Sequence, residues 1–284
     1  MITDFVDSWG LFHDAYLAGW LLAALLSVLG VLVIARDQIF IGAAVSQASI
    51  VGIAAALRLG DLLGATDGSW ARSDPFLSSM AVVGSALAAL LTTRGGEAGG
   101  STHEALTGWV FLLASSLSIL LVAHSPHGLE EVHRLVSSSL IGATETDVAT
   151  FALMGVVTAI GVAVTHRRLL LLAMDPTMAA AVGMRVGVWS GALSLWLGLL
   201  VGLSISVSGV LYTFGCLVLP PLVARNVCRE VRPMFLVAPT VGVVVAAVGF
   251  VVAHHWDYPP AQMTVALLCL LLAISAPVRG LRRS

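Results

Sequence analysis

A polar patch inside a hydrophobic segment is the first part of this sequence whose side chains could do chemistry. In the stretch FIGAAVSQAS at 40–49, helical spacing places on one face Gly42, Ser46 and Ser49, with Ala43 and Gln47 beside them. Small residues at this spacing let helices pack closely. An amide in an apolar segment needs polar partners. Gln47 is therefore predicted either to face a wet route through the protein or to make a structural hydrogen bond to another helix.

Histidines and acids are concentrated in a second region, the segment HSPHGLEEVHR at 124–134. Imidazole and carboxylate groups at this density can bind Zn²⁺ or a similar ion, which gives four candidate ligands: His124, His127, Glu131 and His133. Their spacing matches no closed zinc motif, and solvated loop side chains are the simpler interpretation. The segment HHWD at 254–257 has the same two interpretations, and an interfacial anchor beside its Trp is the simpler one.

Motifs of the common hydrolases are incomplete or missing. HEALT at 103–107 starts like the H-E-x-x-H zinc motif, but Thr107 occupies the position of the second histidine. The sequence has no G-x-S-x-G motif and no G-x-x-x-x-G-K-[ST] phosphate-binding loop. We therefore expect a protein that is not an enzyme and that cannot hydrolyse ATP by itself.

The elements that must position these residues are membrane spans. The 284 residues are 58% hydrophobic and 11% charged, and the mean hydropathy is +0.98. Continuous apolar stretches long enough to cross about 30 Å of hydrocarbon fall at 16–35, 39–58, 76–93, 105–123, 146–165, 186–206, 209–225, 233–253 and 261–278. Because these runs do not alternate, we predict an all-α integral membrane protein, a bundle of about nine helices in one transmembrane domain over 1–284. The net charge of −2 gives no indication of a nucleic-acid partner.

The arginines predict how this bundle is oriented. When the spans are threaded alternately, one side receives Arg58, Arg72 and Arg134, and the other receives Arg36, Arg94, Arg167, Arg168, Arg185, Arg225, Arg229, Arg232, Arg279, Arg282 and Arg283. Arginine is enriched in cytoplasmic loops, so we expect the N-terminus outside and the C-terminus in the cytoplasm. The connection at 124–145 is then an outer loop with a short helix, and the connection at 166–185 is cytoplasmic.

Proline and glycine mark two further features. In the cytoplasmic connection, Asp175 and Pro176 predict a helix N-cap, and Gly183 predicts the stop of a helix of about two turns. A short capped helix at this surface is typical of a docking element. The seventh span is short, and four of its residues predict a broken helix that lines a cavity: Gly209, Gly215, Pro220 and Pro221.

Several segments, taken in order, resemble the permease subunit of the bacterial metal-ion ABC importers, the family that takes up zinc, manganese or iron. The motifs that carry the resemblance are GVLYTFGCLVLPPLVAR at 209–225, DPTMAAAVG at 175–183, SLIGATETD at 139–147 and EALTGWVFLLASSLSILL at 104–121. The resemblance covers about residues 17–278. It implies a type II ABC importer-like fold in the bacterial cytoplasmic (inner) membrane, with a divalent metal as transported substrate and no permanently bound cofactor.

The same resemblance implies roles for individual residues. The segment at 175–183 is similar to the family's coupling segment, which implies contact with a cytoplasmic ATPase subunit through Asp175, Pro176, Ala179 and Gly183. Relatives with an identified ion site usually have Asp and His one turn apart in the second span, where this sequence has Ala43 and Gln47. Only the position carries over, so the translocation pathway is expected to be lined by Ala43, Ser46, Gln47 and Tyr212.

We therefore expect a permease that passes a divalent metal, zinc or manganese before iron, from an extracytoplasmic metal-binding protein to the cytoplasm, together with a second permease copy or a paralogue. One alternative keeps the ABC permease and changes the cargo to a chelated metal or another small solute. Another alternative is a secondary transporter without an ATPase. Against the latter, no Asp, Glu or Arg lies near the centre of a span, where it would couple protons or sodium.

Overall fold

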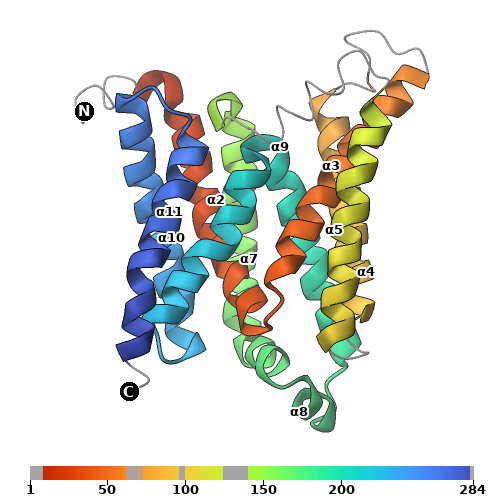
Figure 1. Cartoon of the computed structure of the whole chain (residues 1–284), viewed down its shortest axis with the longest axis vertical. Coiled ribbons are helices and arrows are strands. Elements are labelled where there is room, and N and C mark those ends of the chain that lie inside the picture. The colour runs from red at the N-terminus through yellow and green to blue at the C-terminus, as the bar shows by residue number, and fades with distance from the viewer. Residues whose placement is uncertain (1–8, 63–69, 71–72, 96–99, 124–139, 282–284) are drawn as a thin grey trace. The chain divides into compact units, whose positions relative to one another are not determined.

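The computed structural model describes residues 9–62, 70, 73–95, 100–123 and 140–281 (Figure 1). Its long helices are α2 (Trp9–Ala35), α3 (Ile39–Leu62), α4 (Asp74–Gly95), α5 (Gly100–Val122), α7 (Glu145–Met174), α9 (Val186–Val227), α10 (Val231–His255) and α11 (Pro260–Leu281). Two short elements are the 3₁₀ turn η3 (Leu140–Gly142) and the helix α8 (Pro176–Ala181). These described ranges contain no strand, so the predicted all-α fold class is confirmed.

Eight helices in the described ranges are long and apolar enough to cross a bilayer. One of them, α9, has 42 residues, and at about 1.5 Å per residue it would be about twice as long as the hydrocarbon layer is thick. Gly209, with φ 73° and ψ 176°, leaves helical geometry in the middle of α9. The helix is therefore two successive helices, and this division gives nine spans in the described part of the chain, as predicted.

The contacts within the chain divide it into two compact units. Unit 1 comprises residues 1–37, 138–182 and 211–284, and unit 2 comprises 38–137 and 183–210. Unit 1 thus holds α2, η3, α7, α8, the second half of α9, α10 and α11. Unit 2 holds α3, α4, α5 and the first half of α9. The division inside α9 falls directly after the break at Gly209.

In unit 2, α3 packs against α4 and α5 (Figure 1). The contact with α4 is made by backbone against backbone. A Cβ atom at Gly52 would overlap the carbonyl oxygen of Met80, and one at Gly84 would overlap the carbonyl oxygen of Ala48. Only glycine allows this approach, because any side chain would push the two helices apart.

Hydroxyl groups join α4 to the first half of α9 in the same unit. The Ser85 hydroxyl donates to the carbonyl of Gly198 at 2.7 Å. The Thr93 hydroxyl donates to the hydroxyl of Ser194 at 2.6 Å. A Cβ at Gly198 or Gly202 would lie within 3 Å of α4 atoms. Small and hydroxylated residues therefore hold the helices of unit 2 together, as is usual between helices in lipid.

Unit 1 is organised around α2, which packs against α7, α10 and η3. Its centre is aromatic: the ring of Phe250 lies 5.8 Å from that of Tyr16 and 6.3 Å from that of Tyr212, measured between centroids. A Cβ at Gly19 would overlap the Phe250 ring, so this glycine makes room for the aromatic cluster. The Tyr212 hydroxyl donates to the Gly19 carbonyl at 2.8 Å.

Candidate functional site

The polar patch at 40–49 lies in the first half of α3, where the structure separates its members by exposure. Ser46 and Ser49 are fully buried, whereas Ala43 and Gln47 are half-buried. The half-buried residues continue along the helix at intervals of four residues, through Ala43, Gln47, Val51 and Ala55. Residues four apart form one stripe on a helix surface. The amide of Gln47 is thus the polar group of a stripe that the rest of the chain covers only partly.

The hydroxyls of Ser46 and Ser49 differ from the other buried hydroxyls. Most buried serines donate to a carbonyl, as Ser204 does to Leu200 at 2.6 Å and Ser118 to Ser115 at 2.9 Å. Within the described part of the chain, Ser46 and Ser49 are the only serines or threonines whose buried hydroxyl has no hydrogen-bond partner. An unsatisfied buried hydroxyl costs roughly 1–3 kcal/mol. Water or a polar solute at these positions would remove that cost.

The side chain of Gln47 also lacks a hydrogen-bond partner within the described ranges, and it is more accessible than the two serines. No hydrogen bond joins its amide to another described residue. A glutamine used only to tie two helices together would show such a bond. Together with Ser46 and Ser49, Gln47 gives α3 three oxygen donors within four residues, and this group is the strongest candidate for a solute-contacting site in the chain.

Tyr212, the fourth residue expected on the pathway, lies in the second half of α9. It is fully buried in unit 1, where its hydroxyl is bonded to the Gly19 carbonyl. These contacts give Tyr212 a packing role inside unit 1. Its assignment to the pathway stays a prediction.

Of the four residues expected to break the seventh span, Gly209 alone departs from helical geometry. The helix continues through Gly215, which approaches Val265 of α11, and through Pro220 and Pro221. A proline removes the hydrogen bond to the carbonyl four residues earlier. The freed carbonyls here belong to Cys216 and Leu217, so the question is what replaces the two lost donors.

Residues of helix α2 face the two freed carbonyls. The Ser27 hydroxyl donates to the Ala23 carbonyl of its own helix at 2.5 Å and shares its proton with the carbonyl oxygen of Cys216 at 3.3 Å. Gly30 makes room for the other freed carbonyl, because a Cβ there would overlap the oxygen of Leu217. Neighbouring helices commonly satisfy proline-freed carbonyls in membranes in this way. The signal that could have revealed the contact is a lone serine within the apolar sequence of α2.

The connection between α7 and α9 forms the capped helix that its sequence predicts. Asp175 is the N-cap of α8, its carboxylate accepts from the Met178 N–H at 2.9 Å, and Pro176 is the first helical residue. The chain then leaves the helix at Gly183, whose φ of 81° is in the left-handed region that favours glycine. Ala179 is the buried residue of this short helix.

Two properties make α8 suitable for a protein contact. The Thr177 hydroxyl, 2.6 Å from the Asp175 carboxylate, and the Met178 N–H hold the pKa of Asp175 below its ordinary value, so the cap stays ionised. Met178 of α8 and Val182 directly after it are exposed at an interval of four residues, with 53% and 64% of their surface accessible, and Met174 at the end of α7 is 70% exposed. These apolar side chains suit a protein contact because methionine adapts to its partner.

The expected metal ligands His124, His127, Glu131 and His133 lie outside the described residues. Among the residues that are described, no group of three or more His, Cys, Asp or Glu side chains could hold a metal ion.

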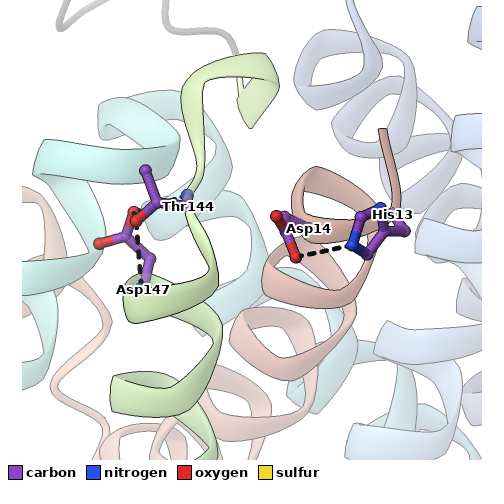
Figure 2. A network of polar contacts seen from close by, with 4 residues as sticks. All are labelled: His13, Asp14, Thr144 and Asp147. Atoms are coloured by element: carbon purple, nitrogen blue, oxygen red, sulfur yellow. Dashed lines mark hydrogen bonds and ion pairs between the residues drawn. The ribbon is translucent and has the colours of Figure 1, made fainter. Parts of the chain in front are cut away.

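Polar contacts at the start of α2 and of α7 are local (Figure 2). Thr144 and Asp147 form a capping box in which the Asp147 carboxylate accepts from the Thr144 N–H at 2.9 Å. His13 lies 3.3 Å from its neighbour Asp14. The segment SLIGATETD of the sequence motif thus begins α7 with a standard cap, and its acids serve the helix start.

Known proteins provide the remaining evidence. The chain is 24% identical over 182 residues to the manganese transport system membrane protein MntB of Synechocystis, a match that covers 63% of this chain and 59% of that protein. It is 22% identical over 277 residues to MntC of Halalkalibacterium halodurans, covering 96% and 90%. The solved PsaBC of Streptococcus pneumoniae in complex with Fab superposes with a TM-score of 0.78 at 20% identity, covering 99% of this chain and 98% of that one. Residues 9–279 match the ABC 3 transport family, so the chain belongs to this family of ABC permeases.

Proposed function

We propose that this permease carries a divalent metal ion, manganese in preference to zinc, into the cell as part of an ABC importer. Family membership and the manganese-transport names of its relatives support the cargo class. The observation that carries the proposal is the group of unpartnered oxygen donors on α3, the hydroxyls of Ser46 and Ser49 and the amide of Gln47.

Oxygen donors favour manganese over zinc. Zinc prefers imidazole and thiolate, whereas carbonyl, carboxylate and water ligands suit manganese. Ala43 offers no ligand and Gln47 offers an amide oxygen, so this segment lacks the nitrogen that would select zinc. A site of this kind holds the ion weakly and lets it leave, as conduction requires. The ion passes with part of its water shell, and the two serine hydroxyls form hydrogen bonds with these water molecules.

A cytoplasmic ATPase docks on α8. Met178 and Val182 offer exposed apolar side chains, and the ionised cap at Asp175 fixes the start of the helix that carries Met178. ATP binding in the partner would then move a rigid, capped element. The arginine distribution supports this cytoplasmic placement, with the N-terminus outside and an extracytoplasmic metal-binding protein on that face.

A second permease copy packs on α7. This helix has 30 residues, and 11% of its most apolar window is buried, the lowest share among the eight candidate spans of the described ranges. Gly155, Ala159 and Ala163 follow one another at four-residue spacing on its uncovered side, a pattern that lets membrane helices approach closely. Oxidative cross-linking of an Ala159→Cys variant, in a background with Cys269→Ser, tests this contact.

The function is tested by ion uptake in cells whose own manganese importer has been deleted. Cells that express this chain with its ATPase and binding protein are expected to accumulate radioactive manganese, and zinc less strongly. The double variant Ser46→Ala with Ser49→Ala should reduce the rate severalfold. Ser204→Ala is the matched control, because this buried serine of unit 2 already bonds to its own helix.

Two results would contradict the proposal. Uptake of neither ion would remove the metal assignment, and uptake of a chelated metal by the same cells would then identify the cargo. An unchanged rate in the double serine variant would remove the α3 donors from the pathway.

A further inference from the structure

Unit 1 contains a pocket that the proposed transport function does not use. Its volume is about 470 Å³, within the range of roughly 300–1,000 Å³ that small-molecule sites occupy. The start of α2, the turn η3, the end of α10 and the connection from α10 to α11 form its wall. The pocket therefore lies at the end of unit 1 where α2 begins.

The wall of the pocket is mostly aromatic and aliphatic. Phe12 and Tyr16 of α2 face Phe250 and His254 of α10, with the Phe12 ring edge-to-face to His254 at 6.4 Å and the Tyr16 ring 5.8 Å from Phe250. Leu140 of η3 and the prolines before α11 complete the apolar surface. Aromatic rings carry negative charge on their faces and attract cations placed over them.

A single acid gives the pocket its charge. Among the described residues, the lining includes Asp257 and no lysine or arginine. No hydrogen bond or ion pair joins the Asp257 carboxylate to another described residue. Asp257 is exposed, and its backbone has a φ of 53°, a conformation uncommon outside glycine. A ligand that fits this wall carries one positive charge and an apolar body.

A metal ion does not suit this lining. Of the lining residues that the structure describes, only Asp257 and His254 carry metal-binding side chains, and a bare divalent ion needs more donors than two. An organic cation needs none of them, because an aromatic wall and one carboxylate recognise an ammonium group. We propose that the pocket binds the ammonium group of an amphiphile, with Asp257 as counter-ion and the rings of Phe12, Tyr16 and Phe250 against its apolar part.

The residues around the pocket favour a membrane lipid with an amine headgroup as this ligand. Three large aromatic side chains are exposed at the same end of unit 1: Trp9, Trp256 and Tyr258. Exposed Trp and Tyr are enriched where a protein meets the lipid headgroups. The pocket thus opens at the depth where an aminolipid presents its ammonium group.

Binding of hexadecyltrimethylammonium to the purified full-length chain tests the proposal, with hexadecanol as the uncharged probe of equal length. We expect the cation to bind about tenfold more tightly than the alcohol, from its contacts with the rings and the acid. Asp257→Asn should bring the cation to the affinity of the alcohol and leave the alcohol unchanged. Glu145→Gln, which removes an acid outside the pocket lining, should change neither.

Competition then separates the two sources of an ammonium group. Displacement by phosphatidylethanolamine in nanodiscs, but not by phosphatidylglycerol, supports a lipid ligand. Displacement by tetramethylammonium at similar concentration supports a soluble amine in the same site. Equal affinity for the cation and the alcohol, or full cation binding by Asp257→Asn in a chain that elutes and melts like wild type, would overturn the proposal.

Discussion

The two units satisfy their buried hydroxyl groups in different ways. In unit 1, Ser27 donates to a carbonyl that a proline has freed, and Tyr212 donates to the backbone of α2. In unit 2, helices approach through glycines, and two buried serines of α3 are left without a partner. Hydroxyls also join helices in unit 2, where Ser85 and Thr93 bond to the first half of α9, but the two serine hydroxyls of α3 have no partner among the described residues and lie next to a half-buried stripe. This difference supports our proposal that α3 is the element that meets a solute.

The largest effect should come from the close approach of α3 to α4 in unit 2. Gly52→Leu places a side chain on the carbonyl of Met80, and overpacking of this kind costs about 3 kcal/mol or more. We expect no monodisperse protein by fluorescence-detected gel filtration. Gly108→Ala in α5 is the control, since nothing lies within 4 Å of a Cβ at that position. Equal melting temperatures for Gly52→Ala and Gly108→Ala would show that the glycine contact does not hold unit 2 together.

A smaller loss of stability is expected when the Cys216 carbonyl of unit 1 loses its hydrogen-bond donor. Ser27→Ala removes a hydroxyl shared between the carbonyls of Ala23 and Cys216 and leaves the Cys216 carbonyl without a donor, which costs roughly 1–3 kcal/mol in unfolding free energy. Pro220→Ala restores a backbone N–H that can bond to that carbonyl. The double variant should therefore be more stable than the two single losses predict, by about 1 kcal/mol. Additive losses in this cycle would mean that Ser27 does not replace the donor that Pro220 lacks.

The serines of α3 should behave in the opposite way. Because their hydroxyls have no partner, Ser46→Ala and Ser49→Ala are expected to leave the unfolding free energy unchanged or to raise it by up to about 1 kcal/mol. Ser204→Ala should lower it, because it removes a hydrogen bond inside α9. Chemical or thermal unfolding in one detergent measures all three variants. A loss of stability in the α3 variants as large as in Ser27→Ala would place their hydroxyls in the packing and not on a route.

The smallest effect on stability is expected at α8, which lies at the surface. Asp175→Ala removes the N-cap and should uncouple ATP hydrolysis from transport with the melting temperature unchanged, while Asp175→Asn keeps a capping side chain and most of the coupling. Since the pKa of Asp175 is lowered in the folded chain, its ionised cap is fully present above the ordinary pKa and is lost as the pH falls through the folded value. Substrate-stimulated ATPase activity of the assembled transporter is the measurement, and equal coupling in both variants would remove α8 from the contact.

The sequence predicts those parts of the structure whose causes are local. The Asp-Pro start and glycine stop of α8 follow from the order of a few residues, and Gly209 breaks α9 as its freedom allows. Pro220 and Pro221 do not break the helix, because Ser27 of α2 supplies a compensating donor. The sequence does not reveal this donor, because Ser27 lies 189 residues away from Cys216. The unpartnered state of Ser46 is equally invisible in the sequence, since it depends on what the neighbouring helices do not supply.

The most direct test of the account is the ratio of manganese to zinc uptake by Gln47→His, measured with both isotopes in the same cells. An imidazole at this half-buried position of α3 adds the nitrogen ligand that zinc prefers. We predict that the ratio falls severalfold, chiefly through faster zinc uptake, while the amount of folded permease in the membrane stays the same. A ratio equal to that of the unaltered permease, at equal expression, would contradict the claim that the α3 stripe contacts the ion.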